Sequence, residues 1–241
     1  MKKYITLLLI LFLTSCQVTE TIHLYEDGSG EIEVSKLREE HSYMQLMAED
    51  YSTEEIFQDT TYVFKDLIAK HSETFSRLPA FEKAIFQKFN TVKVHLNKSS
   101  FEKEFRTTIT QNFTTIEQVA DLYKTEEYAD DIINNYALVA EEHYYSVRFT
   151  FDGSLFKRVV KITDAAQFKK QQEEIERLKI RLSKFKIVQD FVLKYQFPRK
   201  IKSVSNPKAI ISEDQKSLRL QFLMTDCLVN PESTNLEVVL E

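Results

Sequence analysis

Apolar and polar residues alternate along several short stretches of the chain. In the first, alternation over residues 22–25 and 31–34 flanks a turn-forming cluster, Glu-Asp-Gly-Ser-Gly, at residues 26–30. A period of two places the apolar side chains on one face of a strand, and glycine lets the chain reverse between strands. The pattern predicts a β-hairpin over residues 22–34. It also predicts hairpins over residues 92–109 and 145–162, the latter turning at residues 152–154.

Between the hairpins, apolar residues recur at steps of three and four instead. Because this spacing is that of one helix face, we expect residues 36–90, interrupted by Pro79, and residues 115–140 to be mainly helical. A further helix is expected from Asp164, a good N-cap residue, to Phe185. Its apolar stripe consists of Phe168, Ile175, Leu178, Leu182 and Phe185. We expect this stripe to pack on the chain's own sheet rather than form a coiled-coil dimer.

The last fifty residues return to the period of two. Alternation over residues 187–197, 218–224 and 236–241 predicts a β-meander. Because these strands are amphipathic rather than continuously apolar, the sheet should be antiparallel, with one wet face and the other covered by helices. We therefore expect residues 22–241 to form a single α+β domain: an antiparallel sheet of hairpins and a C-terminal meander, covered by helices, with a mainly helical insertion.

The N-terminus has the three parts of a secretory signal peptide. Lys2 and Lys3 precede an apolar run of about ten residues, which is too short for a membrane-spanning helix. The run ends in Leu-Thr-Ser followed by Cys16. This ending resembles the lipobox of bacterial lipoproteins, and the resemblance implies that residues 1–15 are removed and that Cys16 carries the lipid. The alternative is an ordinary signal peptide that is cleaved near a cysteine.

A diacylated Cys16 would hold the protein firmly on a membrane. Each buried acyl CH₂ contributes about 0.8 kcal/mol, and two chains anchor stably where one does not. Residues 16–21 are expected to be a short tether, spanning roughly 20 Å even when fully extended. The domain should therefore lie against the membrane.

Composition excludes several classes of function. Removal of residues 1–15 takes away two lysines and changes the net charge from −5 to −7, which argues against a nucleic-acid partner. Gly28, Gly30 and Gly153 are the only glycines, and no GxGxxG, GxxxxGK[ST] or GxSxG motif occurs. We accordingly expect no cofactor and no enzymatic activity. With Cys16 lipidated, the second cysteine, Cys227, has no disulfide partner within the chain.

None of the polar clusters is typical of a catalytic or metal site. The histidines at positions 23, 41, 71, 95 and 143 lack the spacing of metal ligands, including those beside Glu39-Glu40 and Glu141-Glu142. The carboxylate pairs Asp130-Asp131 and Glu173-Glu174 are neighbours in sequence and cannot by themselves face each other across a cleft. Cys227 lies at a predicted strand end and is expected to be a buried, poorly reactive thiol. We therefore assign no catalytic, cofactor or metal residue.

Three short motifs match glycosylation acceptors. The triplets at Asn97 and Asn112 fit the N-glycosylation pattern, and Asp59-Thr60-Thr61 resembles the O-glycosylation motif of exported proteins in Bacteroidetes-like bacteria. Triplets of this length also arise by chance. Whether any of the three is modified stays open.

The lipobox, the segment 21–30 that follows it directly, and the C-terminal residues 195–204 together resemble uncharacterised Bacteroidetes-type envelope lipoproteins. They are also similar to the mycobacterial LppM-type lipoprotein domain, in which the first hairpin and the final strands form one sheet. Gln17 in place of aspartate after Cys16 implies a lipoprotein that is not retained in the inner membrane, which points to the outer membrane.

These observations lead to two expectations about function. The first is a non-enzymatic binding or structural lipoprotein of the cell envelope, close to the membrane surface, with an envelope protein as partner. The second is a lipid- or glycan-handling module with an apolar pocket between helices and sheet. A hydrolase of unfamiliar type is a third alternative.

Overall fold

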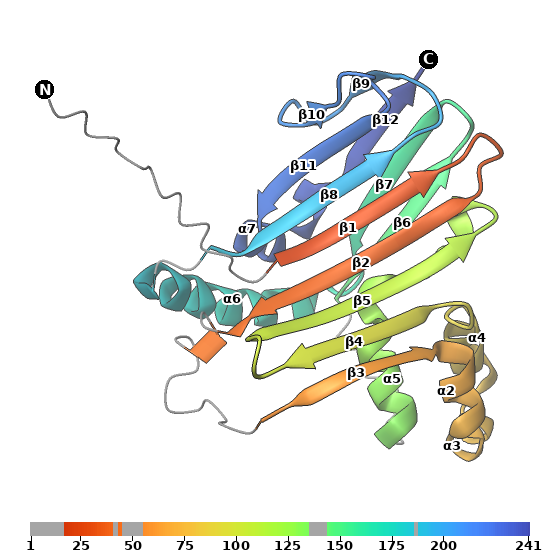
Figure 1. The fold of residues 1–241 in the computed structure, drawn as a ribbon, viewed down its shortest axis with the longest axis vertical. Coiled ribbons are helices and arrows are strands. Elements are labelled where there is room, and N and C mark those ends of the chain that lie inside the picture. The colour runs from red at the N-terminus through yellow and green to blue at the C-terminus, as the bar shows by residue number, and fades with distance from the viewer. Residues whose placement is uncertain (1–16, 41–42, 45–54, 135–143, 186–187) are drawn as a thin grey trace, which may run out of the picture.

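The computed structural model describes residues 17–40, 43–44, 55–134, 144–185 and 188–241, and within them the strands form two sheets (Figure 1). The larger sheet contains, in spatial order, β10 (Ile210–Ile211), β11 (Ser217–Leu223), β8 (Asp190–Gln196), β1 (Gln17–Leu24), β2 (Gly30–Glu39), β5 (Glu104–Phe113), β4 (Lys93–Ser99) and β3 (Phe57–Val63). The smaller contains β6 (Tyr145–Phe151), β7 (Leu155–Ile162), β12 (Leu236–Leu240) and β9 (Ile201–Val204). The predicted α+β class is confirmed.

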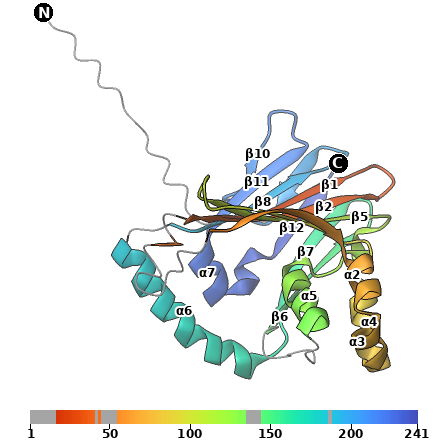
Figure 2. The same ribbon diagram turned by 60° about the horizontal axis from the view of Figure 1, so that its bottom comes forward.

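Helices accompany the sheets. They are α2 (Phe64–Lys70), α3 (Ser72–Arg77), α4 (Ala80–Gln87), α5 (Thr125–Asn134), α6 (Ala165–Phe185) and α7 (Met224–Val229), with 3-10 turns η2 (Ile116–Gln118), η3 (Leu122–Lys124) and η5 (Pro231–Thr234). Figure 2 shows these helices and the smaller sheet on one side of the larger sheet. The predicted arrangement, with helices covering one face and a wet face opposite, is therefore observed.

The three predicted hairpins are confirmed as β1–β2, β4–β5 and β6–β7. In the first turn, the Asp27 carboxylate accepts hydrogen bonds from the amide and hydroxyl of Ser29, and Gly28 has a φ of +83°. Gly30 is needed for a different reason, since a Cβ there would lie 2.1 Å from the carbonyl oxygen of His23. In the third turn, Gly153 has a φ of +96°.

The expected helical stretch over residues 36–90 is wrong in two places. Strand β2 continues to Glu39, and β3 occupies residues 57–63, where it pairs with β4 along its whole length. The apolar residues of β3 are too few to define a period of two. Strand β3 lies at the edge of the sheet and is mostly exposed, so its sequence does not need to alternate. The later part is helical, as α2 to α4. Residues 115–134 form two 3-10 turns and α5, and residues 135–140 lie outside the described part.

The predicted C-terminal meander is divided between the sheets. Strands β8, β10 and β11 belong to the larger sheet, whereas β9 and β12 belong to the smaller. Strand β8 also pairs in parallel with β1, so the larger sheet is not purely antiparallel. Residues 17–21, expected to be a tether, are the first residues of β1 and pair on both sides. The side-chain period of a strand does not reveal which strand becomes its neighbour.

The helix predicted from Asp164 is α6, and the carboxylate of Asp164 caps it by accepting hydrogen bonds from the amides of Ala166 and Gln167. Within the apolar stripe, Ile175 and Leu182 are buried. Helix α6 packs within the chain as expected, but its main contact is with α7 rather than directly with the sheet. The side chain of Phe185 lies outside the described part.

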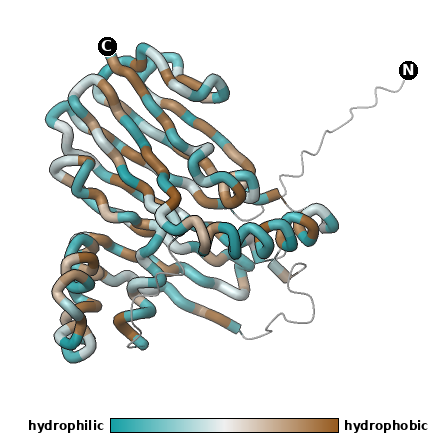
Figure 3. Tube along the Cα trace, turned by 180° about the vertical axis from the view of Figure 1, so that it is seen from behind, coloured by the Kyte–Doolittle hydropathy of each residue, from teal (hydrophilic) through white to brown (hydrophobic). Residues whose placement is uncertain are grey.

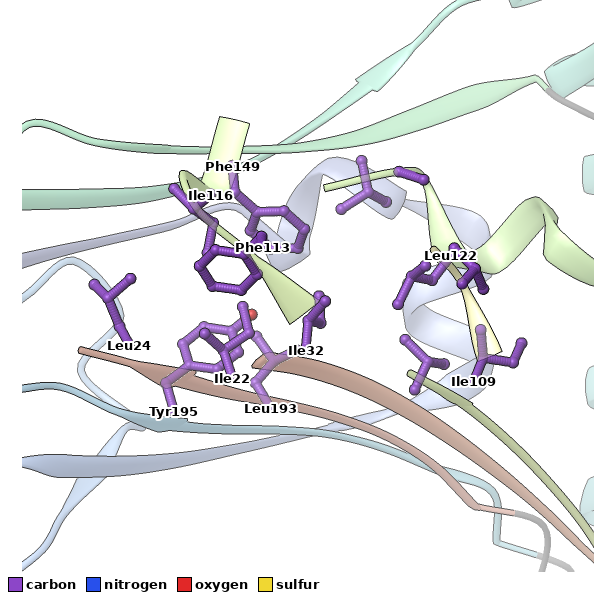
Figure 4. Packing of buried hydrophobic residues seen from close by; sticks show 14 of the residues in the cluster. Ile22, Leu24, Ile32, Ile109, Phe113, Ile116, Leu122, Phe149, Leu193 and Tyr195 are labelled. Carbon is purple, nitrogen blue, oxygen red and sulfur yellow. The ribbon is translucent and has the colours of Figure 1, made fainter. Parts of the chain in front are cut away.

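A cluster of buried side chains fills the space between the two sheets. Figure 3 shows hydrophilic and hydrophobic residues alternating along the strands, as amphipathic strands require. In Figure 4, Ile22, Leu193 and Tyr195 of the larger sheet point toward Phe149 of the smaller. The core thus joins strands of the first hairpin to strands more than a hundred residues away.

Candidate binding site

A charged cluster lies within this apolar core. Glu20 of β1 and Arg158 of β7 are 0% and 2% exposed, and the guanidinium meets the carboxylate with both Nε and Nη2, at 3.0 and 3.2 Å. The hydroxyl of Tyr195 donates to Oε1 of Glu20, and that of Tyr123 donates to Oε2 at 2.5 Å. Arg158 Nη1 donates to the hydroxyl and carbonyl oxygens of Thr234, at 2.7 and 3.2 Å. The cluster links the two sheets.

The hydrogen bonds within the cluster compensate for the burial of the Glu20–Arg158 pair. Burial works against the charged guanidinium, but the Glu20 carboxylate together with Tyr195 and Tyr123 outweighs it, and the pKa of Arg158 is raised. Burial, and then the same carboxylate, hold the pKa values of Tyr123 and Tyr195 well above the ordinary value, so both phenols stay protonated and donate. Because each carboxylate oxygen accepts two hydrogen bonds, the desolvation cost of the charge is offset locally.

A small apolar cavity lies beside the cluster. Its volume is about 90 Å³, and Tyr123 and Arg158 form part of its wall. The rest of the lining is mostly apolar: Val18, Tyr145, Val147, Val160, Phe191, Met224, Cys227, Leu228 and Pro231, with Lys36 and Thr234. An engineered apolar cavity of about 150 Å³ binds benzene, so this one is of the size that receives the end of an apolar chain.

Cys227 belongs to the cavity wall and not to a catalytic arrangement. The residue is buried, as expected, but it lies in helix α7 rather than at a strand end. Burial raises the pKa of its thiol to about 12. Since the thiolate is the nucleophile, a thiol with this pKa is almost fully protonated and unreactive at neutral pH.

A wider groove of about 590 Å³ adjoins the cavity and shares Val18 and Lys36 with it. It lies between the larger sheet and α6, and its apolar lining includes Ile56, Phe105 and Leu178. Figure 2 shows α6 on this side of the sheet. The two spaces therefore lie side by side, with Val18 and Lys36 in the walls of both: one is narrow and apolar, and the other is broader.

The wider groove also contains cationic groups. Lys36 Nζ lies 2.5 Å from the carboxylate of Glu126. The guanidinium of Arg38 lies between the rings of Tyr43 and Phe105, at 4.1 and 4.2 Å from their centroids, which fixes its orientation. Within the described residues its Nε–H makes no hydrogen bond. Arg38 Nη2 also lies 3.1 Å from the buried carboxylate of Glu40, so Arg38 is a partly exposed cation of fixed orientation in the groove wall.

The residues considered for metal binding or catalysis do not come together in the described part of the chain, which contains no group of three or more potential metal ligands. His95 pairs with Asp59 at 2.7 Å on the outer face of the sheet. Asp131 is buried on α5, whereas its neighbour Asp130 is exposed. His41, Glu141, Glu142 and His143 lie outside the described residues.

The glycosylation motifs all lie in strands of the larger sheet. Asn97 and Asn112 are exposed on β4 and β5, and Thr60 and Thr61 are exposed on β3. Each acceptor is therefore accessible, and modification remains a prediction for all three motifs.

The Glu20–Arg158 cluster was missed by the sequence reasoning. A usable signal exists, because Glu20 occupies an inward position of the alternation between Val18 and Ile22, and Arg158 lies between the inward residues Phe156 and Val160. A charged residue at an apolar position of a strand indicates a buried partner of opposite charge. The pattern does not identify that partner.

Comparisons with known proteins add little. No protein-family model and no curated protein matches the chain. Among solved structures, it is similar to the NMR structure of the folded domain of the LppM protein of Mycobacterium tuberculosis, with a TM-score of 0.38 and 8% sequence identity, over 94% of this chain and 89% of that one. A TM-score this low transfers neither fold nor function. The described residues contain no helix that is long and apolar enough to cross a bilayer.

Proposed function

We propose that this protein is a bacterial envelope lipoprotein of the Bacteroidetes type, anchored through Cys16 in the outer membrane, which binds an amphiphilic ligand without transforming it. The lipobox at residues 13–16 supports the anchor. Strand β1 begins at Gln17, so the anchor would join the sheet directly. This would hold the binding site against the membrane.

The neighbouring cavity and groove carry the proposal. The narrow end is almost wholly apolar and suits a hydrocarbon chain, because burial of apolar surface stabilises by about 25 cal/mol per Å². The broader end is lined by Lys98 and by the ion-paired side chains Lys36, Glu126 and Arg38, and this charged wall suits a polar head. Sites of this composition bind molecules with one apolar and one polar end.

Cys227 provides a matched pair of variants for the test. Cys227→Leu adds side-chain volume to the wall of the narrow cavity, whereas Cys227→Ala removes volume. Binding of a fluorescent fatty acid, cis-parinaric acid, is measured on the full-length chain held in an amphipathic polymer without added lipid. We expect the leucine variant to bind about tenfold more weakly, equivalent to about 1.4 kcal/mol, and the alanine variant to bind at least as well as the unaltered protein.

Thermal unfolding of both variants controls for loss of the fold. Equal affinities in two folded variants would show that the narrow cavity is not where the chain binds. Absence of fatty-acid binding by the unaltered protein would contradict the proposed ligand class.

A further inference from the structure

Large apolar side chains are exposed at one end of the larger sheet. We define the anchor-end rim as Met44, Ile56, Phe57, Phe101, Val188 and Leu223. Phe101 and Phe57 are 85% and 79% exposed, Val188 and Leu223 about half, and Met44 and Ile56 38% each. Exposed apolar groups scattered singly are ordinary, but a line of them at one end of a molecule marks an interaction surface.

The strand register places the rim at the end where β1 begins. Gln17 pairs with Leu37 on one side and with Asp190 on the other, and Asp190 pairs with Leu223. Val188 lies two residues before Asp190, and Met44 follows the end of β2. On the far side, Ser99 pairs with both Glu104 and Phe57, and the Ser100 amide donates to the carbonyl of Ile56 at 2.9 Å. Figure 1 shows the ends of these strands on the same side of the molecule.

The rim extends across seven adjacent strands, from β11 to β3. Adjacent strands lie about 4.8 Å apart, so the line of apolar groups is roughly 29 Å long. Gln17 lies within this line, with Val188 and Leu223 to one side and Phe101, Ile56 and Phe57 to the other. A tether alone lets a domain rotate about it, whereas contacts on both sides of the tether define one orientation.

The opposite end of the sheet also exposes apolar side chains, among them Tyr25 and Ile210, but it lies away from Gln17. Its turns contain Glu26, Asp27 and Asp214, and the turn of the smaller sheet contains Asp152. Carboxylates are costly to bring into a hydrocarbon layer. Exposed carboxylates also lie beside the rim, at Glu55 and Glu102, so what distinguishes the rim is its place on both sides of Gln17, where the anchor would join the sheet.

We propose that the anchor-end rim inserts into the lipid bilayer on both sides of the Cys16 anchor and holds the larger sheet with its strands directed away from the membrane. This inference rests on the proposed lipid anchor. Ile56 belongs to the rim and also to the lining of the wider groove, and Val18 of the groove lies next to Gln17. The groove then opens at the bilayer surface, and an amphiphile reaches it from the membrane without crossing water.

Fluorescent probes on single cysteines test the insertion. In the full-length Cys227→Ala chain, reconstituted in vesicles of phosphatidylethanolamine and phosphatidylglycerol, an environment-sensitive dye is placed at position 101 or 223 of the rim. Matched controls carry the dye at Phe81 or Ile210, which are 67% and 65% exposed and lie toward the other end of the sheet. Lipids with a nitroxide on the acyl chain quench only dyes at membrane depth.

We expect most of the emission to be lost at positions 101 and 223 and little to be lost at 81 and 210. Equal quenching at the two ends would overturn the proposal, and so would quenching at only one of the two rim positions, since the contact would then not be two-sided. Acyl labelling of Cys16 is measured on the same samples. An unlabelled Cys16 with quenched rim probes would refute the lipid anchor but not the rim, whereas a labelled Cys16 with unquenched probes would refute the rim alone.

Discussion

Glu20 and Arg158 form a two-point ion pair in the core, joining the strand that follows the anchor to the smaller sheet. The residues are 138 positions apart in the sequence. Their pairing gives β1 a second attachment, in addition to its backbone pairing with β2 and β8. A pulling force applied at Cys16 would therefore be transmitted to both sheets.

Breaking this pair is expected to destabilise the protein strongly. Arg158→Met leaves the Glu20 carboxylate buried without its cation, which should lower the free energy of unfolding by about 3–5 kcal/mol. Urea denaturation measures the change. The control is Lys157→Met, whose salt bridge to Glu237 lies at the surface, where loss of such a pair costs about 0–1 kcal/mol. The double variant Glu20→Leu/Arg158→Met should regain part of the loss, and an equally destabilised double variant would contradict this account.

The thiol of Cys227 should react slowly with a labelling reagent in the folded protein and faster after unfolding. A pKa raised from 9.0 to about 12 lowers the thiolate fraction near neutral pH by about a thousandfold. Labelling with a disulfide reagent is followed with and without urea. Rapid labelling of the folded chain would show that the thiol is ionised and accessible.

The same shift predicts a loss of stability in alkali. The folded state holds the Cys227 proton up to about pH 12, whereas the unfolded chain releases it near pH 9. Above pH 9 the unfolded state binds fewer protons, so the free energy of unfolding falls as pH rises. The tyrosines with raised pKa values add to this decline, equally in the unaltered protein and in the Cys227→Ala variant. Cys227→Ala should show a shallower decline between pH 9 and 10, and parallel curves would contradict the thiol's part in it.

Helix α6 offers a matched test of its packing. Leu182 is 4% exposed, whereas Ile180 is 71% exposed on the same helix. Leu182→Asp should cost several kcal/mol because it buries an unpaired charge, and Ile180→Asp should change stability by less than about 0.5 kcal/mol. Thermal unfolding and sedimentation are measured together. A folded monomer of Leu182→Asp derived from a dimeric parent would show that the stripe is an interface between two copies.

The anchor is tested by Cys16→Ala. We expect the variant to lose its acyl label and its salt-resistant association with the envelope, because stable anchoring requires the attached acyl chains. Metabolic labelling with a fatty acid and fractionation of the cells measure both. Retention of the label on another residue would contradict the assignment of Cys16.

The sequence by itself determined the local structure of this protein. The period of two identified three hairpins, the turn clusters located their reversals, and Asp164 marked the start of α6, because each of these depends on residues close together in the chain. The lipobox and the expectation that Cys227 is buried likewise rest on short segments. Where the local signal was weak, as along β3, the strand was mistaken for a helix.

Tertiary structure alone decided how these parts combine. The pairing of β1 with β8 and the Glu20–Arg158 pair each join residues more than a hundred positions apart, and Leu236 of β12 pairs with Arg158 of β7, 78 positions earlier. The alternation of apolar and polar residues predicts which face of a strand is buried, but it does not predict which strand pairs with it. The groove and the anchor-end rim are formed by several such strands together, so neither exists at the level of any one segment.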